Sequence, residues 1–255
     1  MTVYNTNNYM KKILISITFA TLCLLYSSCS KEQLQNIIKN VPGISNEDAI
    51  AALKEALSIS TDTSVSILNK LDGYYKDEAV KILLPQEAQV IYSNLSKVPG
   101  GNQLLENTIL TMNRAAEDAA SEAKPIFINA ITSMTIQDGM AIIEGSDTAA
   151  TAYLHQKTYS SLYTAFQPKI NQSLSKPIVL GISAESAYQN LINAYNTASL
   201  GGVLWPQINT NGLSAHVTAK GLNGLFLKVS EQEKEIRNDP LAQVTDLLKK
   251  VFGRK

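Results

Sequence analysis

Three polar residues at helical spacing offer the first candidate chemistry. Asn113, Arg114 and Glu117 fall within little more than one helical turn, and Arg114 can pair with Glu117 at i,i+3. Their neighbours are small or apolar, which lets a second helix approach closely and would bury the guanidinium with a carboxylate partner. We therefore expect a buried structural network. The alternatives are a ligand-binding site and a solvated charged face, where such a pair contributes about 0.2–0.5 kcal/mol.

A second group follows one face of a predicted helix. Asp147, Thr151 and His155 are spaced four residues apart, so an acid, a hydroxyl and an imidazole would lie in line, as in a catalytic relay. Asp147 is explained more simply as an N-cap that accepts hydrogen bonds from free backbone N–H groups. A threonine inside a helix and a lone histidine more often have packing or surface roles. We therefore favour structural roles for all three.

The remaining charged candidates lie on neighbouring helices and near the C-terminus. Glu233 and Arg237 form an i,i+4 pair in the favourable order, and Asp239, which precedes a proline, is expected to cap the last helix. Asp138 and Asp147 could meet either arginine in the interior. The candidate polar cluster, structural or ligand-binding, comprises Asn113, Arg114, Glu117, Asp138, Asp147, Thr151, Glu233, Arg237 and Asp239.

Several catalytic signatures are incomplete. The two histidines, His155 and His216, cannot supply three zinc ligands. The sequence SLSK at 173–176 matches SxxK, but no KTG follows it to complete a penicillin-binding site. We therefore predict no catalytic residue, no metal and no cofactor. An aromatic stripe at helical spacing is expected in the core, with a ligand-facing wall as the alternative: Tyr159, Tyr163 and Phe166.

Length and charge narrow the class of protein. The 255 residues are 45% hydrophobic and 17% charged, which suits one globular domain. Lys and Arg total 22, and so do Asp and Glu. Because no global charge attracts phosphate groups, we expect no nucleic-acid partner.

The N-terminus follows the plan of a secretory leader. Two lysines precede an apolar run at 13–26, and two serines and Cys29 follow it. The run is about 14 residues long, whereas crossing a bilayer takes roughly 20. Residues 1–28 are therefore predicted to be a signal peptide rather than a permanent membrane helix. Translation could begin at Met1 or at Met10, since either start leaves a complete leader.

The sequence LYSSC at 25–29 resembles a bacterial lipobox, in which the cysteine after the cleavage site carries lipid. This resemblance implies that Cys29 becomes the acylated first residue of the mature chain. Cys23 would leave with the leader, so no disulfide is available. Acyl chains favour the bilayer by about 0.8 kcal/mol per buried CH₂. Residues 29–45 would then form a short tether, which places the protein in the cell envelope, at the periplasmic face or the cell surface.

Helical periodicity dominates the body of the chain, which we take as one domain over 46–255. Ser45 is a predicted N-cap, Pro125 is expected to kink a long run or to start a new helix, and a bend is expected near Pro168. An extended stretch is plausible only within 74–85. The fold class is therefore all-α, a single irregular domain of about nine helices. Predicted helices begin at 46 and cover 86–97, 102–134, 136–144, 148–174, 184–199, 214–238 and 240–252.

Three long stretches of the body carry a second resemblance. MNRAAEDAASEAKPIF (112–127), MTIQDGMAIIEGSDTAATAYLHQKT (134–158) and EKEIRNDPLAQVTDLLKKVFG (233–253) are similar to domain-of-unknown-function family 4197, exported bacterial proteins with a helical domain. Gly139 departs from the family, which usually has alanine there. The resemblance implies kinship and fold class, and it implies no activity.

The anchor and the incomplete catalytic signatures favour a membrane-anchored envelope lipoprotein whose helical domain binds rather than catalyses. Its expected partners are the lipid bilayer, through acylated Cys29, and an envelope protein or small ligand. One alternative is an envelope hydrolase that uses buried carboxylates such as Glu117, Asp138 or Glu233. The other is a carrier that holds lipid or another small ligand in an apolar cavity between helices.

Overall fold

The computed structural model describes residues 45–179, 181–210 and 212–252. These residues form helices α3 to α11, four short 3₁₀ turns and one two-stranded sheet, so the predicted all-α class is confirmed. The predicted leader, Cys29 and the tether up to residue 44 lie outside the described residues.

Helix α3 (Asn46–Leu68) begins where the sequence predicts. The Ser45 hydroxyl accepts a hydrogen bond from the Asp48 N–H at 3.0 Å, which satisfies one of the free donors at the start of the helix. One face of α3 is apolar and buried, including Leu53 and Leu57. Burial of that face stabilises the helix more than its local sequence does.

The chain between α3 and α5 is irregular. A four-residue helix, α4 (Ile91–Asn94), forms there between two 3₁₀ turns, η2 (Gln86–Ala88) and η3 (Leu95–Lys97), so the single helix predicted over 86–97 is wrong. No strand forms within 74–85, where an extended stretch is plausible, although residues 81–85 are neither helix nor turn. The backbone of Ile82 is instead bonded to a side chain of α5, which takes the place of a neighbouring strand.

The long helical run predicted over 102–134 is divided. Helix α5 (Gly101–Ala119) passes through one 3₁₀ turn, η4 (Ala120–Glu122), into α6 (Ala123–Thr132). Pro125 lies in the first turn of α6, as predicted, where the missing N–H costs no helical hydrogen bond.

Helix α7 (Ile136–Ile143) begins at a capping box, in which the side chains of Thr135 and Asp138 each bond to the other residue's backbone N–H. Helix α8 (Ala149–Ser175) then includes Pro168. These helices match the predicted ranges to within one residue at each end.

A short hairpin follows α8 and is missing from the sequence predictions. Strands β1 (Pro177–Val179) and β2 (Ile182–Ser183) pair antiparallel. Strands this short show no alternation that a periodicity argument could detect. The Ser183 hydroxyl then accepts from the Ser186 N–H at 3.1 Å and caps α9 (Ala184–Ala198).

Helix α10 (Ser214–Asn238) has the predicted bounds. The helix predicted over 240–252 is interrupted, because its first residues form only a 3₁₀ turn, η5 (Pro240–Ala242). Asp239 accepts from the Leu241 N–H at 2.9 Å and so caps η5. The prediction that Asp239 caps the last helix is therefore wrong.

The last helix, α11 (Asp246–Phe252), is capped by Thr245, whose hydroxyl accepts from the Leu248 N–H at 3.2 Å. This helix packs against α3, and Lys250 Nζ lies 2.9 Å from Asp48 Oδ2. The first and last described helices are therefore side by side.

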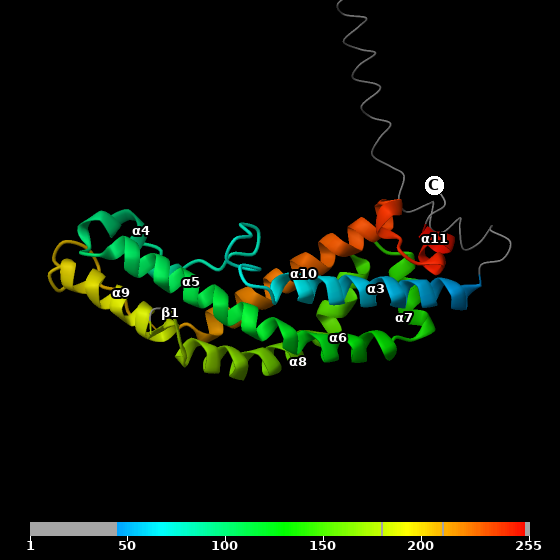
Figure 1. The fold of residues 1–255 in the computed structure, drawn as a ribbon, viewed down its shortest axis with the longest axis horizontal. Coiled ribbons are helices and arrows are strands. Elements are labelled where there is room, and N and C mark those ends of the chain that lie inside the picture. Colours follow the sequence, from blue (N-terminus) through cyan, green and yellow to red (C-terminus); the bar gives the residue numbers. More distant parts are fainter. Residues whose placement is uncertain (1–44, 180, 211, 253–255) are drawn as a thin grey trace, which may run out of the picture.

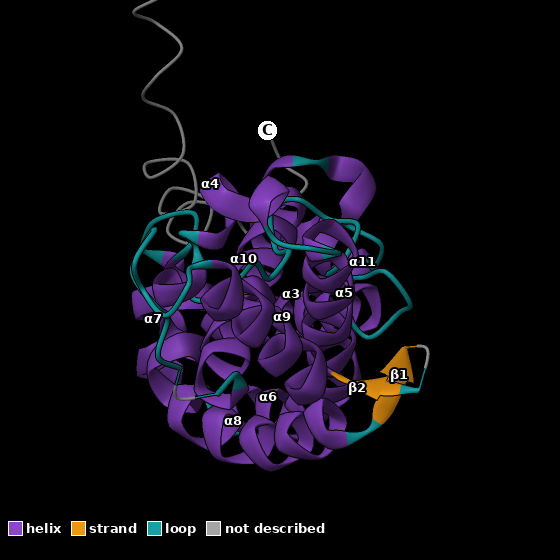
Figure 2. Ribbon diagram, turned by 90° about the vertical axis from the view of Figure 1, so that its left-hand side faces the viewer, coloured by secondary structure: helices purple, strands orange, loops and turns teal. Residues whose placement is uncertain are grey.

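The helices pack into an elongated bundle (Figure 1). Helix α8 contacts α10, α5 and α6, while α3 contacts α10, α6, α7 and α11. Helices α4 and α9 lie at one end of the bundle, and α7 and α11 lie toward the other (Figure 1). The view along the bundle shows the small hairpin at its edge (Figure 2). Buried apolar residues from the helices form one connected core.

Among the described helices, none is by itself long and apolar enough to cross a membrane; the bent pair Gly101–Thr132 and Ile136–Ile143, at 101°, meets the length and composition test.

Candidate functional site

Arg114 lies between two carboxylates. Its Nη1 donates to Glu117 Oε2 and its Nη2 to Asp72 Oδ1, both at 2.6 Å, and only 18% of its side chain is exposed. The guanidinium is also 5.8 Å from the centre of the Tyr75 ring. The pKa of Asp72 is lowered mainly by its hydrogen bond from Lys76 and, to a smaller extent, by that from Arg114. Arg114 is thus paired on both sides within the protein.

Glu117 and Asn113 both lie on α5 and form hydrogen bonds with the irregular segment that follows α3. Glu117 is 4% exposed, and its Oε1 accepts from the N–H groups of Tyr74 and the next residue at 3.1 and 3.2 Å. Asn113 is fully buried and pairs with the N–H and C=O of Ile82 at 2.8 and 2.9 Å. We call Asn113, Arg114 and Glu117 the clamp, because each binds that segment to α5.

A second cluster joins α10 to the start of α8. Glu233 accepts from the N–H groups of Ala150 and Thr151 at 3.1 and 2.8 Å, and from the Thr151 hydroxyl at 2.7 Å. Arg237 Nε donates to Glu233 Oε1 at 3.0 Å. Glu233 therefore caps α8, and the prediction that Asp147 caps this helix is wrong. The residue at the N-cap position of α8 makes no side-chain capping bond, so a carboxylate from 82 residues away takes the free N–H groups.

A small cavity adjoins this second cluster, between α3 and α10. It offers about 10 Å³ for the centre of a water molecule, which is room for about one water. Two polar atoms beside it, Ser60 Oγ and Arg237 Nη2, are buried without a hydrogen-bond partner among the described residues. Arg237 Nη2 is 3.0 Å from Glu233 Oε1 but is not aligned for a hydrogen bond. The cavity suits one bridging water and is too small for an acyl chain.

Asp138 and Asp147 join neither cluster, so the prediction that they meet Arg114 or Arg237 in the interior is wrong. Asp138 bonds to the Thr135 hydroxyl and N–H at 2.7 and 3.1 Å, and the hydroxyl contact is the main cause of its lowered pKa. Its carboxylate is used at the end of its own helix.

The residues of the proposed relay have separate partners. The Thr151 hydroxyl donates to Glu233. His155 is exposed, and its ring centre lies 4.8 Å from that of Tyr159 and 4.7 Å from that of Phe226. The Thr151 hydroxyl thus donates its hydrogen bond to a carboxylate of another helix, and the three residues do not form a relay. Of the aromatic stripe, Phe166 is fully buried and the two tyrosines pack against the core.

Two further motif residues also have structural partners. Ser173, from SLSK, is fully buried and donates to Asp118, whereas Lys176 of that motif is exposed. His216 Nε2 lies 2.8 Å from the Leu83 carbonyl oxygen, and burial lowers the pKa of His216. Within the described ranges, no group of three His, Cys, Asp or Glu side chains is placed to hold a metal ion.

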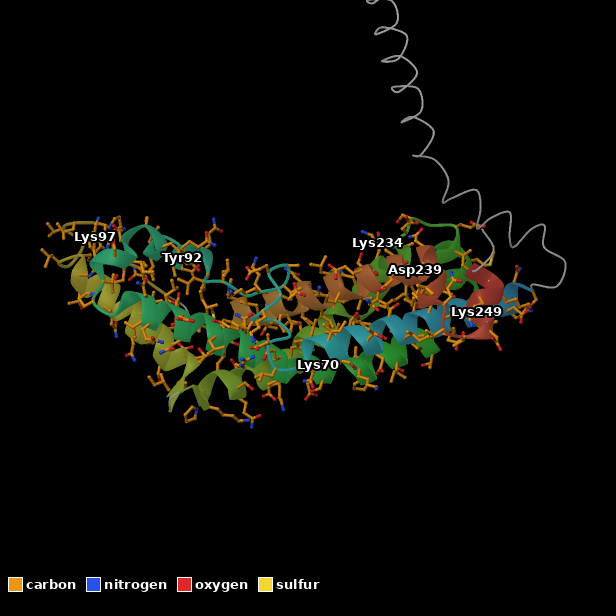
Figure 3. The ribbon with its side chains drawn as sticks, turned by 45° about the horizontal axis from the view of Figure 1, so that its top comes forward. Lys70, Tyr92, Lys97, Lys234, Asp239 and Lys249 are labelled. Atoms are coloured by element: carbon orange, nitrogen blue, oxygen red, sulfur yellow. The ribbon has the colours of Figure 1, made fainter. Side chains whose placement is uncertain are left out.

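The sequence reasoning missed a surface at the α4–α9 end of the bundle. The loop at 199–205 exposes Leu200 by 64%, Val203 by 80% and Leu204 by 58%. Lys97, labelled at this end in Figure 3, lies beside the loop's tryptophan. We call residues 199–205 together with Lys97 the apolar tip.

A charge pattern in the sequence could have identified the apolar tip. No Asp, Glu, Lys or Arg occurs between Glu185 and Lys220. Between Glu87 and Glu106, Lys97 is the one charged residue. These two charge-poor stretches meet at one end of the fold, which periodicity along a single helix does not reveal.

The comparisons with known proteins give one match. A family model described as "Protein of unknown function (DUF4197)" matches residues 43–253. No curated protein and no solved structure matches the chain.

Proposed function

The chain belongs to the DUF4197 family of proteins of unknown function, and we propose on other grounds that it is an envelope lipoprotein whose helical domain acts by binding rather than by catalysis. One observation carries the second half of this proposal. The buried carboxylates of the candidate cluster are occupied by hydrogen-bond donors of the protein itself.

The two buried carboxylates show this occupation. Both oxygens of Glu117 are bonded, one to two backbone N–H groups and the other to Arg114. Both oxygens of Glu233 are bonded at the start of α8, and one also accepts from Arg237. A general acid or base must come within hydrogen-bond reach of the substrate atom that it protonates or deprotonates. Carboxylates held in this way support the fold, which leaves the exposed surface to carry the function.

The first half of the proposal rests on the N-terminal sequence. A short apolar run, small residues and Cys29 resemble a lipobox. Two or three acyl chains on Cys29 would hold the protein on a bilayer, since each buried CH₂ contributes about 0.8 kcal/mol.

The anchor is tested by Cys29→Ser in cells labelled with a radioactive fatty acid. The wild-type protein is expected to carry label and to pellet with membranes, and Cys29→Ser is expected to lose the label. Cys23→Ser is the matched control, since Cys23 lies in the predicted leader and should leave both results unchanged. Label that persists on Cys29→Ser would overturn the anchor. Hydrolysis of envelope material by the purified protein, lost in Glu117→Gln or Glu233→Gln variants that keep their fold, would overturn the binding assignment.

A further inference from the structure

We propose that the apolar tip docks on the surface of a lipid bilayer. This contact goes beyond the proposed function, because it uses the folded domain and needs no acyl chain. It lies at the end of the bundle opposite the start of α3, where the tether joins (Figure 1).

The loop of the apolar tip has a fixed conformation that directs its aliphatic side chains outward. Leu200, Gly201 and Gly202 all have positive φ, at 53°, 72° and 96°. For a leucine this conformation is uncommon and costs free energy, so surrounding contacts must hold it. Ser199 is fully buried and supplies them: its Oγ accepts from the Gly202 N–H at 2.9 Å, and its C=O accepts from the Leu204 N–H at 3.0 Å.

The residues flanking the exposed aliphatics suit a membrane–water boundary. Trp205 is half-buried, with its ring centre 5.7 Å from that of Tyr195. Lys97 Nζ lies 5.1 Å from the Trp205 ring centre. Tyr195 is only 1% exposed, so Trp205 is the member of this aromatic pair that can reach headgroup level, where tryptophan is enriched. A lysine there can lay its stem on apolar surface while its ammonium stays in water.

Charge and area favour a bilayer over a protein surface. The two charge-poor stretches contain no carboxylate that would repel phosphate headgroups, and Lys97 complements them. The three exposed aliphatic side chains offer on the order of 100 Å² of apolar surface each. That is under half of the roughly 800 Å² per partner in a standard protein interface. A small projecting apolar loop can enter a fluid surface without a matching pocket.

The test uses Trp205, because it is the one tryptophan in the chain. The native acylated protein is reconstituted into vesicles at low surface density, with part of the phospholipid brominated on its acyl chains. Bromine quenches tryptophan only at close contact. We expect loss of Trp205 emission in brominated vesicles relative to unbrominated ones. The double variant Val203→Asp with Leu204→Asp should restore that emission, because carboxylates resist entry into the acyl region.

The matched control is Leu241→Asp, which adds a carboxylate at an aliphatic residue that is 88% exposed. It lies two residues from Asp239, which Figure 3 labels far from Lys97. This variant should keep full quenching. All variants are first compared with wild type by circular dichroism and thermal melting, so that misfolding is recognised.

Vesicle flotation separates the two proposals. Protein that floats but shows no quenching, or equal quenching in the tip variant, overturns docking of the tip and leaves the anchor intact. Protein that lacks acyl label yet is quenched in excess vesicles overturns the anchor and supports the tip. Trp205 emission that changes with protein concentration in lipid-free detergent would assign the tip to a second copy instead. A copurified protein that shields Trp205 from aqueous quencher would assign the tip to that protein.

Discussion

Arg114 links two parts of the chain that are 42 residues apart, through Asp72 on one side and Glu117 on the other. Arg114→Ala would leave a nearly buried carboxylate with only backbone donors. We expect this to lower the free energy of unfolding by about 2–4 kcal/mol, somewhat less than for a fully buried pair because Arg114 retains some exposure. Urea unfolding followed by circular dichroism measures the change.

Lys76→Ala is the matched control for Arg114→Ala, because Lys76 also pairs with Asp72 but is 72% exposed. Its loss should change the free energy of unfolding by no more than about 0.5 kcal/mol. Equal effects of the two variants would show that the position of Arg114 between two carboxylates contributes nothing special.

In each polar cluster, local spacing predicts only the pair of residues that lies within one helix. The pairs Arg114–Glu117 and Glu233–Arg237 are visible as i,i+3 and i,i+4 neighbours. The partners Asp72 and Thr151 are not visible, because tertiary packing brings them from other helices and turns. A single sequence therefore indicates which residues need a partner without identifying the partner.

At the scale of elements, Gly224 of α10 lets the irregular segment after α3 pack closely. A Cβ on Gly224 would lie 2.9 Å from Tyr74 Cε1 and 3.1 Å from Val80 Cβ. Tyr74 is fully buried, and its hydroxyl donates to the Gly221 carbonyl at 2.8 Å. The tyrosine ring thus occupies space that any larger residue at 224 would need.

Gly224→Ala should therefore destabilise the protein although it favours the helix. Alanine gains about 0.8–1.0 kcal/mol of helix propensity over glycine, but overpacking a filled core costs about 1–3 kcal/mol. We expect a net loss of about 1 kcal/mol in the free energy of unfolding. Urea unfolding monitored by circular dichroism provides the measurement.

Gly221→Ala, one turn earlier, is the matched control. A Cβ there would be 3.6 Å from Ala116 Cβ, an ordinary contact. This variant should keep the propensity gain and be neutral or stabilising. If both variants stabilise equally, close packing of Tyr74 is not what requires glycine at 224.

Elements with a long hydrophobic pattern in the sequence were predicted more accurately than short elements. Helix α10 matched its predicted bounds because helical spacing continues up to the Asp239–Pro240 boundary. The β1–β2 hairpin was missed because its strands have three and two residues. The single helix predicted over 86–97 failed because the chain there forms a four-residue helix between two 3₁₀ turns at the end of the bundle. This segment contacts α5 and bonds to α9 through Asn94 and Tyr195, contacts that local sequence does not encode.

At the scale of the whole molecule, one connected core joins the two ends of the bundle. It includes Val98 and Tyr195 near the apolar tip and Leu248 and Val251 on the last helix. Trp205 packs against this core. The two ends should therefore unfold together, since loss of packing at one end exposes core at the other.

We expect urea transitions of Trp205 fluorescence and of helical circular dichroism to coincide for the detergent-solubilised protein, which is the standard sign of a two-state transition. An earlier fluorescence transition with most helicity retained would show that the α4–α9 end unfolds as a separate unit. Repeating both curves at several protein concentrations separates unfolding from dissociation.

The contact between Lys250 and Asp48 brings the two outer helices of the described chain together, while the Gly201–Gly202 turn lies at the far end of the bundle. The described chain therefore begins and ends at the same end of the bundle. A protein fused behind the last helix would lie next to the start of α3, where the proposed tether joins. The same protein inserted into the Gly201–Gly202 turn would lie at the opposite end of the bundle. The fold therefore offers two fusion sites, one at each end.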